Sequence, residues 1–232
     1  MKKTTVKNWK PETQERFSSA HANYLAEAMD AELLPVLHVQ RGNAKTGAIP
    51  CINMPMLITC PAGAACRSYC YVGNECRYKN QLTFRYNSRN LALFLRDKTA
   101  FANAVKAAVF NDSIIRWHES GEIVNADYFG IMVEIANFYP CKKFYAYTKK
   151  YDIVNDYIVK NGDLPSNLVV IFSADKNLKM GNPFNLPVAR IDFGNGEKVD
   201  GFKCPGKCME CAMNGVGCMN LKCGETVVFT AH

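Results

Sequence analysis

The sequence of 232 residues has no hydrophobic run long enough to cross a membrane. Its longest apolar stretches are as short as a strand, whereas a membrane-spanning helix needs about 20 apolar residues. The basic N-terminus, Met1 to Lys10, is not followed by an apolar segment, so no secretory signal is expected. These absences predict a cytoplasmic protein with no membrane partner. Its eleven cysteines are then expected to be metal ligands or catalytic groups, because the cytosol keeps thiols reduced.

Blocks of like charge and a phosphate-loop spacing are also missing. The 28 lysines and arginines outnumber the 21 aspartates and glutamates, and the net charge of +7 is spread along the chain. That charge favours anionic partners, but without a basic block it supports nucleic-acid binding only weakly. The turn at residues 42–47 is bounded by glycines and contains a lysine, but it lacks the spacing of a phosphate loop.

The composition is that of a globular protein, with 48% hydrophobic and 21% charged residues, and the length fits one domain. We expect residues 1–50 to form an N-terminal helix and lead-in, and residues 51–77 a cysteine loop. Residues 78–200 are expected to form βα units, and residues 201–232 a cysteine-rich tail with the last strand.

Hydrophobic periodicity predicts the elements of an α/β fold. Helices are expected over residues 11–34, 81–95, 98–110, 126–138 and 151–160, where the second and third are two helices or one bent helix. Strands are expected over 113–118, 143–148, 167–174, 187–192 and 226–230, and residues 49–59 are extended. Strands that alternate with helices form βαβ units, which predicts a parallel sheet curved into a partial or complete TIM-like barrel.

Polar side chains follow the predicted strands, where parallel α/β proteins bind their ligands. Arg116 and Lys149 suit a carboxylate or phosphate, and His118 and Glu122 suit proton transfer. The predicted catalytic residues are Arg116, His118, Glu122, Tyr147, Lys149 and Asp175. The predicted cofactor contacts are Tyr71, Ser120 and Ser173. Together they predict a site for a small anionic substrate.

The first cysteine-rich stretch has the pattern Cys60-x5-Cys66-x3-Cys70, built from small and turn-forming residues. Three thiolates on one loop suit a [4Fe–4S] cluster whose fourth iron binds a distant ligand or the substrate. Zinc is the alternative metal, although zinc sites more often show close cysteine pairs. Cys76 lies six residues further on, and the sequence does not decide whether it is a ligand.

A second stretch reads Cys204-x3-Cys208-x2-Cys211-x6-Cys218, followed by Cys223. Four of these thiolates can enclose one zinc ion or one four-iron cluster, so either Cys218 or Cys223 is spare. The predicted ligands are Cys204, Cys208, Cys211 and Cys218. A ligand role for the terminal His232, and a single site shared by both cysteine stretches, stay open.

Several short pieces, in this order, resemble the phage gene-product-88 family, and they cover nearly the whole chain from residue 40 on. The pieces are Thr59-Cys60-Pro61 with Cys66 and Cys70-Tyr71, Arg89-Asn90, residues 116–122, 144–149 and 173–175, the C-terminal cysteine run, and Val228-Phe229 to His232. Members of that family are encoded by bacteriophages and by some bacterial genomes, so the resemblance implies a cytoplasmic protein, in the host cytoplasm if it is phage-encoded. It does not imply a particular activity.

The arrangement also resembles, more distantly, the radical S-adenosylmethionine enzymes. These enzymes place a three-cysteine loop at the head of a partial α/β barrel, and some add a C-terminal auxiliary cluster. Their loop typically reads Cys-x3-Cys-x2-Cys with an aromatic residue before the last cysteine. Here Tyr69 precedes Cys70, but the spacing is x5 and x3. This likeness implies S-adenosylmethionine as a cofactor.

Two hypotheses of different class follow from these patterns. The first is an iron–sulfur protein with one or two [4Fe–4S] clusters, a redox or radical S-adenosylmethionine-like enzyme acting on a small anionic substrate. The alternative is a zinc-stabilised module that binds nucleic acid or protein and has no catalytic activity.

Overall fold

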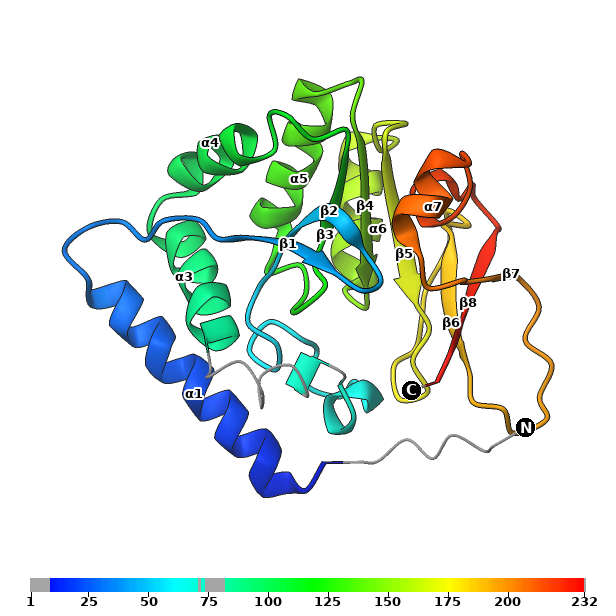
Figure 1. Cartoon of the computed structure of the whole chain (residues 1–232), viewed down its shortest axis with the longest axis horizontal. Helices are drawn as coiled ribbons and strands as arrows, with labels where there is room; N and C mark the ends of the chain where they lie inside the picture. Colours follow the sequence, from blue (N-terminus) through cyan, green and yellow to red (C-terminus); the bar gives the residue numbers. More distant parts are fainter. Residues whose placement is uncertain (1–8, 71, 74–81, 232) are drawn as a thin grey trace.

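The structure, a computed structural model, describes residues 9–70, 72–73 and 82–231. One eight-stranded sheet runs through this part of the chain in the order β1-β2-β3-β4-β5-β6-β8-β7 (Figure 1). Only β1 and β2 pair antiparallel. The strands are β1 (Val39–Asn43), β2 (Gly47–Ile52), β3 (Ile114–Trp117), β4 (Lys143–Thr148), β5 (Leu168–Ser173), β6 (Val188–Asp192), β7 (Phe202–Lys203) and β8 (Thr226–Thr230).

The sheet is open, and the predicted TIM-like barrel is not confirmed. A barrel closes when its first and last strands pair, but β1 pairs only with β2 and β7 only with β8 in the described sheet. The antiparallel strand β1 forms one edge, and the two-residue strand β7 forms the other. The α/β class and the mostly parallel sheet are confirmed.

Helices fill the connections from β2 to β3, from β3 to β4 and from β4 to β5, as predicted, whereas no helix lies between β5 and β6. The predicted helix over 126–138 has the observed bounds, and the stretch from 81 to 110 divides into two helices at Asp97, whose side chain accepts a hydrogen bond from Ala100 N. The helices are α1 (Pro11–Asp30), the 3₁₀ helix η1 (Ala65–Ser68), α3 (Leu82–Arg96), α4 (Lys98–Ala108), α5 (Ala126–Phe138), α6 (Tyr151–Asn161), α7 (Cys208–Met213) and the 3₁₀ helix η2 (Cys218–Asn220).

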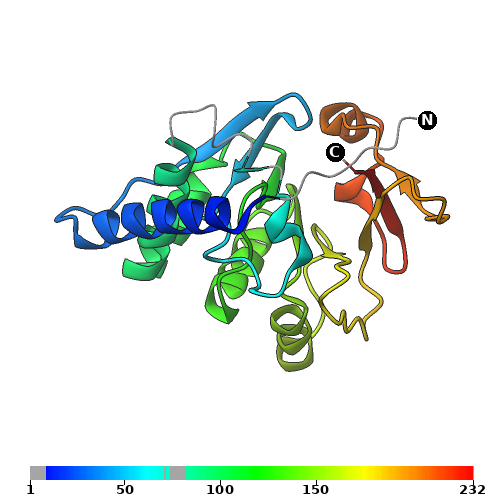
Figure 2. The same ribbon diagram turned by 90° about the horizontal axis from the view of Figure 1, so that it is seen from below.

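Helix α1 is shorter than predicted, because it ends at Asp30 and not at residue 34. Acidic residues at Asp30 and Glu32 are unfavourable near the negative end of a helix dipole, and Pro35 disfavours helical geometry in the residue before it. α1 packs along α3 (Figures 1 and 2). None of the helices in the described ranges is both long and apolar enough to span a membrane.

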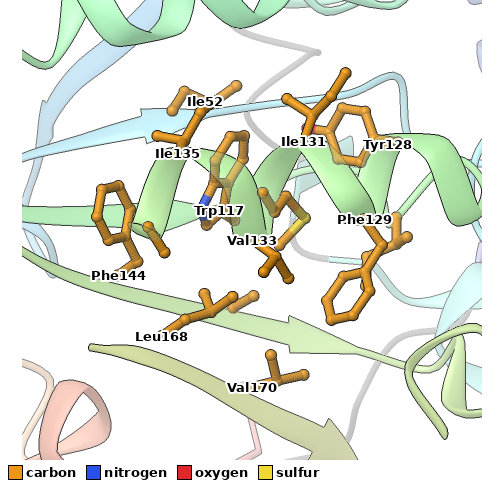
Figure 3. Close-up of a cluster of buried hydrophobic side chains, with 14 of the residues drawn as sticks. Ile52, Trp117, Tyr128, Phe129, Ile131, Val133, Ile135, Phe144, Leu168 and Val170 are labelled. Carbon is orange, nitrogen blue, oxygen red and sulfur yellow. The ribbon is translucent and has the colours of Figure 1, made fainter. Parts of the chain in front are cut away.

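The two faces of the sheet have different cores, because successive side chains of a strand point to opposite faces. On the helix-covered face, Trp117, Phe144 and Leu168 point toward α5, where they meet Ile131 and Ile135 (Figure 3). The opposite face packs the alternate strand residues against the cysteine-rich tail and α7 (Figure 2). This alternation decides which predicted site residues can meet.

Candidate metal centres at the sheet

The first cysteine set, Cys60, Cys66 and Cys70, lies in the loop between β2 and α3 that contains η1. Arg67 holds this loop in a compact shape, because its Nη1 donates to the carbonyl oxygens of Leu57 at 2.8 Å and Cys60 at 3.3 Å. All three cysteines are partly buried. The loop is therefore a folded unit stabilised by its own side chains.

Two acidic residues attach this loop to the C-terminal edge of the sheet, Asp175 through its carboxylate and Glu122 through its backbone N–H. Asp175, just after β5, accepts the Ala65 N–H with both oxygens at 3.0 Å, so it caps η1. Glu122 N donates to Thr59 Oγ1 at 2.9 Å, one residue before Cys60. The predicted rim residues Asp175 and Glu122 therefore lie beside the first cysteine set.

Glu122 also joins the loop to the end of β4. Its side chain is buried, with Oε2 accepting from Thr148 Oγ1 at 2.7 Å and Oε1 from Lys149 N at 3.0 Å. Burial raises the pKa of the Glu122 carboxyl, against the opposing effect of the Lys149 charge and these hydrogen bonds. Glu122 thus holds the backbone of Lys149, the first residue after β4.

The thiols of the first cysteine set are close enough to affect one another. Burial, followed by Glu122 and Cys70, raises the pKa of Cys60 to about 12, and burial with Cys66 raises that of Cys70 to about 11. Burial disfavours the Lys149 ammonium, but Cys66 and Glu122 outweigh it and raise the pKa of Lys149. Thiols with such pKa values are protonated and inert near neutral pH, unless a metal ion stabilises the thiolate.

The second cysteine set consists of Cys204, Cys208, Cys211 and Cys218. It lies on the face of the sheet that is turned away from α5. Cys204 follows β7 and its N–H donates to Val228 O at 2.8 Å; α7 carries Cys208 and Cys211, and η2 begins at Cys218. The last three are buried, whereas Cys223 is exposed. Cys218 is therefore buried like Cys208 and Cys211, and Cys223 is not.

Some cysteines of the second set are close enough to affect the pKa of their neighbours. Burial raises the pKa of Cys218 to about 11, with Cys204 and Cys208 adding to the rise. Burial and the same two cysteines also raise the pKa of Cys211. Gly217 lies so close to Cys211 that a β carbon there would be 3.2 Å from its Sγ.

The donor chemistry of both sets fits a thiolate-bound metal, because each set consists of partly or fully buried thiols. Within residues 9–70, 72–73 and 82–231, however, no three Cys, His, Asp or Glu side chains are grouped so that they could hold a metal ion. The residue types thus fit a metal, but the described side chains are not gathered around one.

Arg116 and Tyr147 lie on the face of the second set, and not with Lys149. The Arg116 guanidinium carbon is 5.3 Å from the centre of the Tyr147 ring, and Tyr147 packs against the buried cluster that contains Cys208 and Cys218. The predicted rim therefore divides into two groups. Glu122, Lys149 and Asp175 lie beside the first cysteine set, and Arg116 and Tyr147 lie beside the second.

His118 contacts Tyr128 of α5, where its Nε2 is 3.0 Å from the hydroxyl. The histidine has a positive φ of 58°, so it does not continue the alternation of β3. Burial, and then the Arg116 charge, lower the pKa of His118 to about 3. His118 is therefore a neutral side chain at neutral pH, although its proposed role in proton transfer stays a prediction.

The predicted cofactor contacts are scattered. The Ser120 hydroxyl donates to Met54 O at 3.0 Å and accepts from Asn87, so it ties buried loops together. The Ser173 carbonyl accepts from the Tyr151 hydroxyl at the end of β5. Tyr71, Cys76 and His232 fall outside the described residues.

Arg67, Thr59 and Thr148 hold the loop and Glu122 in place, and the sequence does not predict these contacts. Thr59 and Thr148 each precede a residue that was selected for its chemistry. No local pattern in the sequence marks either threonine as a partner of Glu122, because the three residues meet only through the tertiary fold.

Acid is expected to destabilise the fold through two buried histidines. Burial lowers the pKa of His21 and of His118 from 6.5 to about 3, so both are neutral when folded and take up protons on unfolding. The free energy of unfolding therefore has its full contribution from the two histidines above pH 6.5. It falls as pH decreases from 6.5 toward 3, by about 1.4 kcal/mol per pH unit for each histidine.

Urea unfolding at pH 7 and pH 5 measures this loss of stability. The variant His21→Gln should lose less stability between the two pH values than the unchanged protein does. If the pH dependence is the same in both proteins, His21 does not contribute to it.

An open, mostly parallel α/β sheet, with one cysteine set at its C-terminal edge and a second set on one face, defines the class of this protein. Within that class, the chain belongs to the gene product 88 family, whose profile matches residues 8–191. The match includes the first cysteine set, Glu122, Lys149 and Asp175, and it ends before the second set. Comparisons with curated proteins and with solved structures give no match. The predicted family is confirmed, and the likeness to radical S-adenosylmethionine enzymes gains no support.

Proposed function

We propose that this protein is an iron–sulfur enzyme with two thiolate-bound centres. Cys60, Cys66 and Cys70 would hold the first centre, and the second cysteine set would hold the other. The observation that carries this proposal is the position of the first cysteine set, which lies beside Glu122 and Lys149 at the C-terminal ends of parallel strands. Ligands of open α/β sheets bind at that edge.

The three thiols of the first set favour a reactive centre over a closed one. Three protein thiolates leave one iron of a four-iron cluster without a protein thiolate, so that a substrate or cofactor can reach it. When bound, such a cluster supplies electron transfer. Whether S-adenosylmethionine occupies the open position stays a prediction, which a binding assay on the reduced protein decides.

Lys149 supplies the positive charge that an anionic substrate needs. It is partly buried, and its ammonium makes no hydrogen bond or ion pair with any of the described residues. A cation held in this way attracts a carboxylate or a phosphate group. Glu122 and Thr148 orient Lys149 from the backbone side, so the chain positions the charge before the substrate arrives.

The zinc hypothesis is favoured by one observation, which concerns the second set. Cys208, Cys211 and Cys218 are buried and attach the C-terminal tail to the sheet. Structural zinc sites are closed in this way, with four protein ligands. A zinc-stabilised module that binds nucleic acid or protein is therefore the second candidate function.

Anaerobic purification followed by metal analysis separates the two functions. The iron–sulfur proposal predicts brown protein that contains iron and acid-labile sulfide. Colourless protein with stoichiometric zinc would contradict it and support the zinc-stabilised module.

A further inference from the structure

A pocket of about 450 Å³ opens at the N-terminal ends of strands β3 and β4, at the upper edge of the sheet in Figure 1. Because β3 and β4 are parallel, this edge is opposite to the one that carries Glu122 and Lys149. The pocket is lined by residues 110–113, which lead into β3, and by residues 138–142, which lead into β4. Its volume is within the range of small-molecule sites, roughly 300–1,000 Å³.

Hydrogen bonds hold both walls of the pocket in place. Lys142 Nζ donates to Phe110 O and to Asp112 O, each at 2.6 Å, so one ammonium group ties the two loops together. Asn167 Nδ2 holds the second loop from behind, because it donates to Tyr139 O at 3.0 Å and to Lys142 O at 2.9 Å. A pocket that is formed before its ligand arrives binds that ligand with a smaller loss of conformational entropy.

Two exposed phenylalanines give the pocket an aromatic lining. Phe110 is 67% exposed and Phe138 is 59% exposed. Phe138 packs edge-on against Tyr139, with the ring centres 4.8 Å apart, and the Lys106 ammonium lies 4.8 Å from the centre of the Phe138 ring. These rings present apolar surface to water, and another aromatic ring covers such surface favourably.

The pocket also carries a positive charge that no carboxylate of the described residues neutralises. Asp112 lines the pocket, but both of its carboxylate oxygens accept from Arg41 at 2.8 Å. Lys142 forms no ion pair with the part of the chain that the structure describes. Its ammonium has three N–H donors, and two carbonyl oxygens accept from two of them. A carboxylate complements the charge and the remaining donor.

We propose that this pocket is a second ligand site, which binds a small aromatic carboxylate. The aromatic ring of the ligand packs against Phe110 and Phe138, and its carboxylate accepts from the Lys142 ammonium. The site needs no metal and lies at the edge of the sheet opposite to Lys149. Its test is therefore independent of the proposed function.

Calorimetric titration of the full-length protein with two matched probes tests the ligand class. 2-Naphthylacetate and 2-(2-naphthyl)ethanol share a ring system, but only the first has a carboxylate. The acid should bind about 10-fold more tightly than the alcohol, or better, which is the size expected for a hydrogen bond to a charged group. Equal affinities of the two probes, or no saturable binding of the acid, would overturn the proposal.

Cys141 reports where the probe binds, because this exposed cysteine lines the pocket. Its alkylation by iodoacetamide, followed by peptide mass spectrometry, should slow down when 2-naphthylacetate is present at saturation. Cys223 is exposed outside the pocket and should react at an unchanged rate, so it serves as the control within the same molecule. An unchanged rate at Cys141 would place the probe elsewhere and overturn the proposal.

Phe138→Ala tests the aromatic wall. It should weaken the binding of 2-naphthylacetate about 2–10-fold, which is the contribution of one aromatic pair. Phe193→Ala is the matched control, because Phe193 is an exposed phenylalanine that does not line the pocket, and this variant should bind as the unchanged protein does. Equal affinities of the two variants would contradict the site.

Discussion

Replacing Gly121 with alanine is expected to lower the free energy of unfolding by about 3 kcal/mol or more, since strained backbone alone costs on the order of 1–3 kcal/mol. Gly121 has a φ of 78°, and an alanine β carbon there would lie 2.5 Å from Met54 O and 2.7 Å from the Met54 carbonyl carbon. Relief of this clash requires a backbone shift near the hydrogen bond from Met54 N to Ser120 O. Urea unfolding monitored by circular dichroism measures the loss.

Gly194→Ala provides the comparison, because Gly194 has a φ of 65° but no heavy atom within 4 Å of an added β carbon. The free energy of unfolding of this variant should fall by only about 1 kcal/mol, which is the cost of a backbone conformation that favours glycine. Equal losses in the two variants would show that the approach of Met54 to Gly121 does not matter for stability. Gly121 lies next to Glu122, so the same comparison tests how rigidly the first site is held.

Replacing Gly217 with alanine is expected to remove the metal from the proposed second centre without changing a cysteine. Gly217 has a φ of 83° and a ψ of −168°, a conformation that is almost restricted to glycine. A β carbon at this position would lie 2.8 Å from Cys211 Cβ and 3.2 Å from its Sγ. The displaced Cys211 would no longer complete a set of four ligands.

Metal content per chain measures the effect, with Gly215→Ala as the control from the same loop. Gly215 has a φ of 68° and open space around an added β carbon, so its variant should keep the metal. The Gly217→Ala protein should lose the metal of the second centre and retain that of the first. An unchanged metal content in Gly217→Ala would argue against Cys211 as a ligand.

Strands with a local apolar pattern could be predicted from the sequence. β4 and β8 have the predicted bounds. β7 has two residues and α7 has six, so neither is long enough to produce a recognisable periodicity, and both were missed. The sequence also could not show that the sheet stays open, because closure depends on whether the first and last strands pair with each other.

The cysteine sets could be recognised from the sequence because their spacing is local, but the division of the rim could not. Arg116 and Trp117 are adjacent and point to opposite faces of β3, so Arg116 joins the second cysteine set while Trp117 joins the helix-side core. Lys149 lies two residues beyond Tyr147, past the end of β4, and belongs to the first set. The sequence predicts one rim of polar residues at the strand ends, but the side chains of each strand alternate between the two faces of the sheet.

Iron and acid-labile sulfide per chain, measured in anaerobically purified protein and in two cysteine variants, test the central claim most directly. The Cys66→Ser variant removes one thiol of the first cysteine set, and Cys141→Ser removes an exposed cysteine outside both sets. We expect the unchanged protein and Cys141→Ser to hold iron and sulfide for two clusters, and Cys66→Ser to lose those of one cluster. Equal iron and sulfide in all three proteins, or none in the unchanged protein, would contradict an iron–sulfur centre at Cys60, Cys66 and Cys70.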